Sequence, residues 1–159
     1  MTHDPQHRKF LTFLLGREVY AVDILRVKEI RGWSPVTRIP QSPDSLLGVL
    51  NLRGAVVPVV DLRVRFGLQA VEFNATTVII VLTLRSATGH REFGIVVDSV
   101  QDVVDIDAAG IKPAPAVNAA SGTFIEGIAT HDEQMLILLD TESLAAGESL
   151  PTKTASQAA

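Results

Sequence analysis

Residues 48–67, which read GVLNLRGAVVPVVDLRVRFG, are the most informative stretch of the chain. Apolar runs at 46–52 and 55–60 flank a tight turn at residues 51–54, Asn-Leu-Arg-Gly. Two β-rich runs separated by such a short polar turn are typical of a β-hairpin. The stretch therefore predicts two antiparallel strands, with a short basic segment after the second strand.

The same pattern returns later in the chain. A shift of 79 positions places Gly48 on Gly127 and Asp61 on Asp140, with apolar residues matched to apolar residues and no gap between them. A shift of 73 positions matches three earlier segments, namely 20–22 with 93–95, 27–30 with 100–103, and Pro40 with Pro113. One loop insertion accounts for the change of register. Because the matches keep the same order in both halves, they indicate one β module used twice, side by side.

Most of the chain between these blocks also has strand character, because short runs rich in Val, Ile and Leu alternate with turn residues. The predicted strands are 10–15, 18–22, 27–33, 46–52, 55–60, 76–84, 92–97, 100–106, 123–130 and 134–139. Short strands at this spacing favour small closed barrels, which leave no exposed sheet edge. We expect a mainly all-β fold of two packed barrel subdomains, at about 16–67 and 75–140.

Two short helices complete the predicted elements. Asp61 is suited to cap a helix at 61–66 that Gly67 would end. A second short helix is expected at 141–146, close to the end of the second module.

Composition limits the functional classes. The chain has 159 residues, of which 47% are hydrophobic and only 5% aromatic, so we expect an aliphatic core of ordinary size. Its formal charge of −4 argues against nucleic acid or an anionic membrane as a general partner. It contains no cysteine, begins with a polar segment unlike a signal peptide, and has no apolar run of membrane-spanning length. These features predict a soluble, intracellular protein without disulfides.

The sequence offers no clear catalytic or metal-binding pattern. The histidines lack the spacing of metal ligands, and no serine lies in a nucleophile motif or beside a glycine-rich phosphate loop. Four aspartates, read as the exposed edge of a strand, are Asp98, Asp102, Asp105 and Asp107. Arg63 and Arg65 are interpreted as part of a solvated helix face. The chain is thus expected to be neither an enzyme nor a holder of a cofactor.

The turn at 51–54 differs between the repeats. The second module makes the equivalent connection with residues 130–133, Thr-His-Asp-Glu, so the fold does not demand the sequence Asn-Leu-Arg-Gly. Gly54 could supply a positive φ. Arg53 is unusual in an apolar block, because a buried cation needs a partner, and Glu29 is a candidate. Two interpretations stay open: both side chains point to solvent, or they pair at a protein-binding surface.

Several motifs carry a resemblance to a known family. They are Gly48–Gly54 (GVLNLRG), Val57–Arg63 (VPVVDLR), Val27–Gly32 (VKEIRG) and Gly94–Val100 (GIVVDSV). Together they resemble the CheW family, the bacterial chemotaxis adaptors that couple chemoreceptors to the histidine kinase CheA. The NLRG-x-x-x-P-x-x-DLR block is quite specific to CheW-like domains. The resemblance covers nearly the whole chain and implies one domain at 9–147, with flexible tails at 1–8 and 148–159.

The resemblance implies a fold and a set of partners. It implies two five-stranded barrels packed around a hydrophobic core, and a scaffold without catalysis or cofactor that is cytoplasmic and recruited to receptor arrays. The partners would be the signalling tip of methyl-accepting receptors and the C-terminal regulatory domain of CheA. By matching position, the receptor groove or its edge would contain Val27, Glu29, Gly48, Val78 and Val100. The kinase contact or its support would be Asn51, Leu52, Arg53 and Gly54.

Alternatives stay open at this point. Val78 and Val100 could be core valines, and for Val100 the core is the better interpretation. A CheW-like scaffold of a related array, serving twitching, biofilm formation or gene control, has the same sequence features. A small-barrel nucleic-acid-binding module would need a basic face and stacking aromatics, which the charge of −4 and the single Trp disfavour. An enzyme or small-ligand binder has no supporting residue set.

Overall fold

A computed structural model of the chain describes residues 6–69, 71–86, 89–113 and 124–146. All ten predicted strands are present, most of them longer by one to three residues at an end. Of the tails expected at 1–8 and 148–159, residues 1–5 and 148–159 lie outside the described residues, whereas His7 and Arg8 belong to a strand. The start of the strand expected at 123 also lies outside them. The strands are β1 (His7–Leu15), β2 (Glu18–Asp23), β3 (Val27–Gly32), β4 (Leu46–Leu52), β5 (Ala55–Asp61), β6 (Val78–Ser86), β7 (Gly89–Val97), β8 (Ser99–Asp107), β9 (Ile125–His131) and β10 (Gln134–Leu139).

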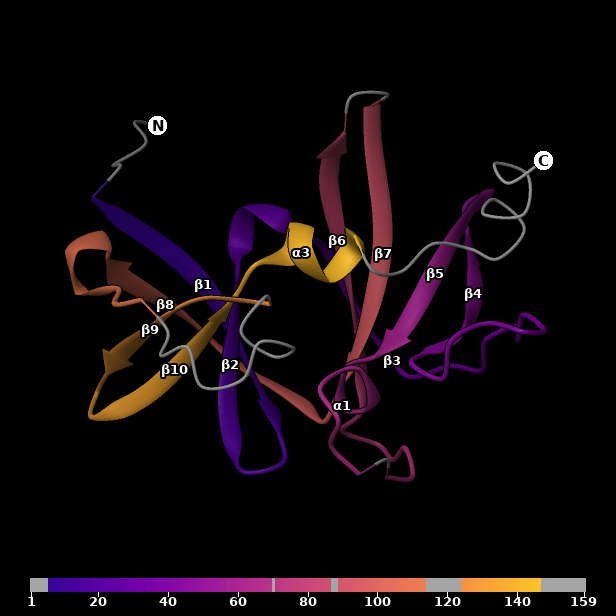
Figure 1. Ribbon diagram of the computed structural model, residues 1–159, viewed down its shortest axis with the longest axis horizontal. Coiled ribbons are helices and arrows are strands. Elements are labelled where there is room, and N and C mark those ends of the chain that lie inside the picture. The colour runs from indigo at the N-terminus through magenta and orange to yellow at the C-terminus, as the bar shows by residue number, and fades with distance from the viewer. Residues whose placement is uncertain (1–5, 70, 87–88, 114–123, 147–159) are drawn as a thin grey trace.

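The strands form two five-stranded sheets that lie side by side (Figure 1). Sheet A has the order β8-β1-β2-β10-β9, and sheet B has the order β3-β6-β7-β5-β4. Each sheet therefore combines a hairpin from one half of the chain with three strands from the other half. The predicted subdomains at 16–67 and 75–140 do not correspond to the sheets, because the two repeats exchange their first hairpins.

The repeat itself is confirmed at the level of register. In sheet B the parallel pair β5 and β7 sets Val59 opposite Gly94, and in sheet A the parallel pair β10 and β2 sets Leu138 opposite Ala21. Shifts of 79 and 73 positions convert the first pair into the second. The antiparallel hairpins β4–β5 and β9–β10 also have their register irregularity at equivalent positions. The two sheets are thus the same unit built twice.

Neither sheet closes into the barrel that strand spacing predicts. Among the described residues, no ladder joins the edge strands β3 and β4 of sheet B or the edge strands β8 and β9 of sheet A. The connections that follow β3 and β8 instead run along the opposite edge and make single bridges, Thr37 with Val49 and Lys112 with Ile128. These short segments thus cover some of the backbone N–H and C=O groups at the sheet edge. In a closed barrel, a neighbouring strand would pair with those groups.

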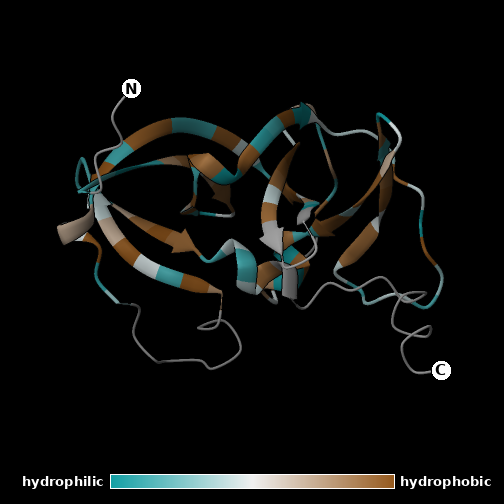
Figure 2. Ribbon diagram, turned by 90° about the horizontal axis from the view of Figure 1, so that it is seen from above, coloured by the Kyte–Doolittle hydropathy of each residue, from teal (hydrophilic) through white to brown (hydrophobic). Residues whose placement is uncertain are grey.

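Several strands, such as β5 and β6, contain runs of successive apolar residues, so side chains are buried on both faces of a sheet (Figure 2). One face of each sheet contributes to a large core shared by both sheets, which includes Leu11, Phe13, Ile80, Leu82, Phe93 and Ile95. Each sheet also has a smaller core of its own, around Phe10 and Leu138 in sheet A and around Val59 and Ile79 in sheet B. Burial of aliphatic surface in these three cores is the main stabilising term.

Both predicted helices are present. Helix α1 (Leu62–Arg65) has Asp61 as its N-cap, whose carboxylate accepts the Arg63 backbone N–H, and Gly67 follows its end at φ +77°. Helix α3 (Thr141–Ala146) begins after Asp140, whose carboxylate accepts the N–H of Glu142 in the same way. Two 3-10 turns, η1 (Ile24–Arg26) and η2 (Ala108–Gly110), follow β2 and β8. In the described part of the chain, no helix has the length and apolar character needed to cross a membrane.

Candidate functional site

The β4–β5 turn presents a single charged side chain. Arg53 and Gly54 both have positive φ, +53° and +91°, which is the geometry of a two-residue hairpin turn. The Asn51 side-chain Oδ1 accepts the Gly54 backbone N–H at 2.9 Å, and Leu52 is buried in the core of sheet B. Asn51 and Gly54 therefore shape the turn, Leu52 anchors it, and Arg53 is exposed at its tip.

Arg53 pairs with Glu29, as one of the two interpretations expects, whereas a protein-binding surface at this place stays a prediction. The Arg53 Nη2 donates to Glu29 Oε1 at 2.5 Å, although 68% of the arginine side chain is exposed. Arg31 approaches the other carboxylate oxygen of Glu29 at 3.5 Å. The hydrogen bond from Arg53 lowers the pKa of Glu29, so the carboxylate is ionised at neutral pH. The pair connects the β4–β5 turn to β3, the strand at the other edge of sheet B.

The equivalent turn of sheet A shows that the backbone does not need this arginine. Asp132 and Glu133, which occupy the positions of Arg53 and Gly54, have φ values of +50° and +66°. Non-glycine residues are uncommon in this region, and here both turns use them. The hairpin register therefore fixes the backbone conformation of the turn. Arginine at residue 53 is not needed for that conformation and instead determines the charge of the exposed surface.

Val27, Val78 and Val100 have a common environment. Each is partly buried and packs against the core shared by the two sheets. Val27 lies opposite Leu82 on the adjacent strand, and Val100 lies opposite Phe13, so both side chains face the shared core from an edge strand. This environment is compatible with a groove edge and with a core position, and the assignment to a receptor groove stays a prediction.

Two apolar residues that sequence reasoning missed extend this edge. Ile30 on β3 and Val103 on β8 occupy equivalent positions of the two repeats, and they are 44% and 48% exposed. Their ladder partners Ile80 and Leu11 belong to the shared core, so Ile30 and Val103 are on the same sheet faces. The signal that could have identified them is their match under the shift of 73 positions, within segments already aligned.

Gly48 has a clear structural role. It is buried in β4, and a Cβ atom added there would lie 2.3 Å from the backbone oxygen of Thr37. The bridge between Thr37 and Val49 needs this close approach. Gly127 supports the equivalent bridge in sheet A, because its Cβ would meet Lys112 O at 2.8 Å. Both glycines thus mark a close backbone approach, whereas a groove position for Gly48 stays untested.

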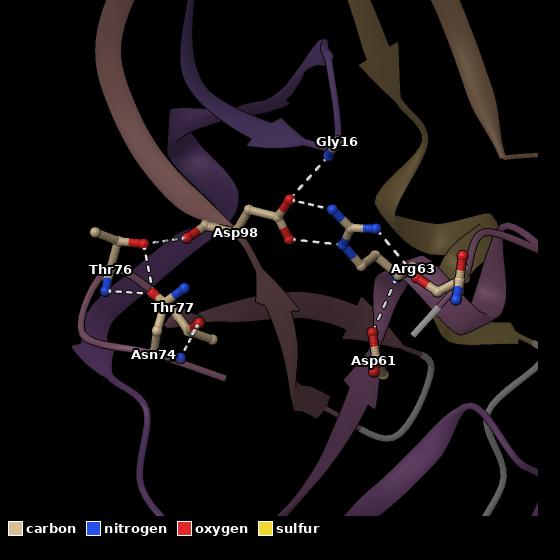
Figure 3. A network of polar contacts seen from close by, with 8 residues as sticks. Gly16, Asp61, Arg63, Asn74, Thr76, Thr77 and Asp98 are labelled. Carbon is tan, nitrogen blue, oxygen red and sulfur yellow. Dashed lines mark hydrogen bonds and ion pairs between the residues drawn. The ribbon is translucent and has the colours of Figure 1, made fainter. Parts of the chain in front are cut away.

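Arg63 and Asp98 differ from their predicted roles. They form a bidentate ion pair, with Nε to Oδ1 at 2.8 Å and Nη2 to Oδ2 at 2.6 Å (Figure 3). Only 16% of the Arg63 side chain and 27% of the Asp98 side chain are exposed, so neither belongs to a solvated helix face or a freely exposed strand edge. The hydrogen bond from Arg63 lowers the pKa of Asp98. The prediction of exposed aspartates is confirmed for Asp102, Asp105 and Asp107.

The structure also bears on metal binding. In the described ranges, no cluster of three or more His, Asp or Glu side chains is placed to hold a metal ion.

The fold is that of a β-rich protein with two related sheets. In one sheet, the arginine of a hairpin turn pairs with a glutamate on the strand at the other edge of the same sheet. The model of the CheW-like domain matches residues 9–149, and the chain therefore belongs to the CheW family. It is 46% identical to chemotaxis protein CheW of Klebsiella aerogenes over 144 residues, covering 90% of this chain and 84% of the relative. It is 32% identical to chemotaxis protein CheW of Bacillus subtilis, covering 94% of each chain.

A solved structure gives the same result. The crystal structure of scaffolding protein TtCheW from Thermoanaerobacter tengcongensis has a TM-score of 0.77 and 34% sequence identity, over 88% of both chains. At this identity the likeness extends from the fold to the sequence, and it agrees with the family assignment.

Proposed function

We propose that this chain is a non-catalytic adaptor that couples methyl-accepting chemoreceptors to the histidine kinase CheA in bacterial chemotaxis. The family match and the names of its relatives support the chemotaxis role. The observation that carries the proposal is Arg53, a cation kept exposed and oriented by Glu29 on a turn whose backbone forms equally well without it. Such a residue serves recognition rather than folding.

The receptor side of the proposal uses the edges of β3 and β8. Val27 and Val100 pack at the border of the shared core, and Ile30 and Val103 continue the same faces into solvent. An apolar edge of this kind suits the apolar face of a helix, and a receptor signalling tip is a helical hairpin. Glu29 and Arg31 then provide charged groups beside the apolar edge, which fix the register of the bound helix.

The kinase side of the proposal uses the β4–β5 turn. Arg53 would contact the C-terminal regulatory domain of CheA, while Asn51, Leu52 and Gly54 hold the turn in shape. Arginine suits this role because its planar guanidinium can donate to Glu29 and to a partner at the same time. The Val56 side chain on β5, which is 60% exposed, adds apolar surface next to the turn.

An adaptor with these two surfaces needs no catalytic group. By holding kinase and receptor together it raises the effective concentration of one at the other. A signal passes only if a change of receptor state alters the relative free energies of the kinase arrangements that the adaptor holds. Such an effect is a coupling free energy between the receptor site and the kinase site. The protein would act in the cytoplasm, at receptor arrays on the membrane.

The receptor proposal is tested by titrating the purified chain with a receptor signalling-tip fragment. Replacing Ile30 by serine removes exposed apolar surface at the proposed edge and should weaken binding about fivefold or more. Leu25→Ser is the matched control, because Leu25 is 76% exposed but lies on η1, outside the β3 edge. Equal affinities of Ile30→Ser and the unmodified chain would contradict the proposed receptor surface.

A further inference from the structure

Asp98 connects the two sheets with every polar group it has. It is the single residue between β7 of sheet B and β8 of sheet A. On the side of sheet A, its N–H donates to Leu14 O at 3.0 Å and its Oδ2 accepts the Gly16 N–H at 2.8 Å. On the side of sheet B, its carbonyl accepts the Thr76 hydroxyl at 3.1 Å and its carboxylate binds Arg63 (Figure 3).

Arg63 is held as firmly as its partner. Its Nη1 donates to Gln69 O at 3.1 Å while Nε and Nη2 bind Asp98, and its backbone N–H donates to the cap Asp61. A bidentate guanidinium–carboxylate pair fixes an angle as well as a distance, because two parallel hydrogen bonds must stay aligned. The pair therefore constrains how helix α1, at the end of β5, is oriented relative to the β1–β2 turn.

The second connection between the sheets, from β2 to β3, lacks an ion pair of this kind. The repeat places Leu25 at the position of Asp98 and Glu142 at the position of Arg63, so no ion pair can form between them. Leu25 lies on η1, between β2 of sheet A and β3 of sheet B, with 76% of its surface exposed. One repeat makes its crossing without the pair, so the fold alone does not require Arg63 and Asp98.

We propose that Arg63 and Asp98 are positioning residues whose ion pair sets the angle between the two sheets. The spacing of the β3 and β8 edges depends on that angle, because one edge belongs to each sheet. The pair thus keeps Ile30 and Val103 at the separation that a helical partner needs. This last step rests on the proposed receptor function, whereas the control of the angle does not.

The control of the angle is tested by measuring the distance between the sheets. The chain has no cysteine, so spin labels can be attached only where cysteines are introduced. Ala55 on β5 and Gln134 on β10 are exposed and occupy equivalent positions, one in each sheet. Double electron–electron resonance on the Ala55→Cys/Gln134→Cys chain should show a narrow distance distribution, which broadens or shifts in Asp98→Asn and Arg63→Ala. Glu142→Ala is the matched control and should leave the distribution unchanged.

Arg63→Lys keeps the charge but loses the bidentate geometry, and it should broaden the distribution less than Arg63→Ala does. Arg63→Lys also provides a second measurement of the distance distribution if Arg63→Ala does not fold. A distribution that is unchanged in folded Asp98→Asn and Arg63→Lys would overturn the proposal that this pair sets the angle.

Binding of the receptor-tip fragment tests the positioning role. We expect Asp98→Asn to lose about 2- to 30-fold in affinity, as do other changes that act on a site through its support, with its circular dichroism spectrum retained. A broadened distance distribution with unchanged affinity would overturn the positioning role. If the unmodified chain does not bind the fragment at all, the proposed receptor function fails, and the distance distributions alone decide whether the pair controls the angle.

Discussion

Gly48 gives the sharpest test of how the edge of sheet B is built. In Gly48→Ala the new methyl group would lie 2.3 Å from Thr37 O and 2.7 Å from Thr37 C, which are backbone atoms that cannot rotate away. Either the clash persists, or the segment moves and loses the two hydrogen bonds between Thr37 and Val49, at 3.0 and 2.8 Å. Overpacking of this kind costs about 1–3 kcal/mol, and each lost backbone bond costs about 0.5–1.5 kcal/mol.

Either outcome is expected to lower the free energy of unfolding of Gly48→Ala by about 1–3 kcal/mol, measured by urea denaturation. For a chain of this size that corresponds to a fall in Tm of roughly 2–12 °C. Gly32→Ala is the matched control, because nothing lies within 4 Å of its added Cβ. It should be neutral or stabilising by up to about 1 kcal/mol. If the two variants were equally stable, the close approach at Gly48 would not be a structural requirement.

Three further predictions follow from the contacts described. Because Arg63 lowers the pKa of Asp98 below its ordinary value of 3.8, the pair stabilises the fold above that pH, and this stabilisation is lost as the pH falls through the lower pKa of the folded state. The difference in free energy of unfolding between the unmodified chain and Asp98→Asn, measured with urea, should therefore shrink in acid, and a constant difference would contradict the pairing. Phe73→Ala should shift the fluorescence of the single Trp33 to longer wavelength, because the two ring centroids lie 4.3 Å apart; an unshifted spectrum would argue against this contact. Glu29→Lys should weaken receptor-tip binding more than it lowers Tm, because Glu29 is on the proposed receptor edge, and unchanged binding in a pull-down would count against that placement.

The sequence was sufficient to predict the strands and the repeat. Apolar runs with turn residues between them defined all ten strands, and Asp61 correctly marked the start of the first helix. The exchange of hairpins between the sheets could not be predicted. The alignment equates the hairpin of β1 and β2 with that of β6 and β7, so either hairpin fits the parallel ladder of either unit, and only the three-dimensional packing selects one.

A residue of the candidate site could be predicted where it differs between the two repeats. A contact between two residues far apart in the sequence could not. Arg53 was identified because the second repeat has a different turn, and Glu29 was a plausible partner on charge alone. The Arg63–Asp98 pair was missed because the two residues lie 35 positions apart, and each has an ordinary local explanation as a helix or strand-end residue. The available signal was a single Asp between the apolar run 93–97 and the strand predicted at 100–106.

Under the proposed function, Arg53 couples the kinase to the receptor and does not support the fold. The most direct measurement is CheA autophosphorylation in a mixture of the kinase, receptor-tip assemblies and this chain, compared with the same mixture containing Arg53→Ala. We expect stimulation by the unmodified chain and its loss in the variant, with unchanged circular dichroism of the variant. Full stimulation by folded Arg53→Ala, or none by the unmodified chain, would rule out this role of Arg53.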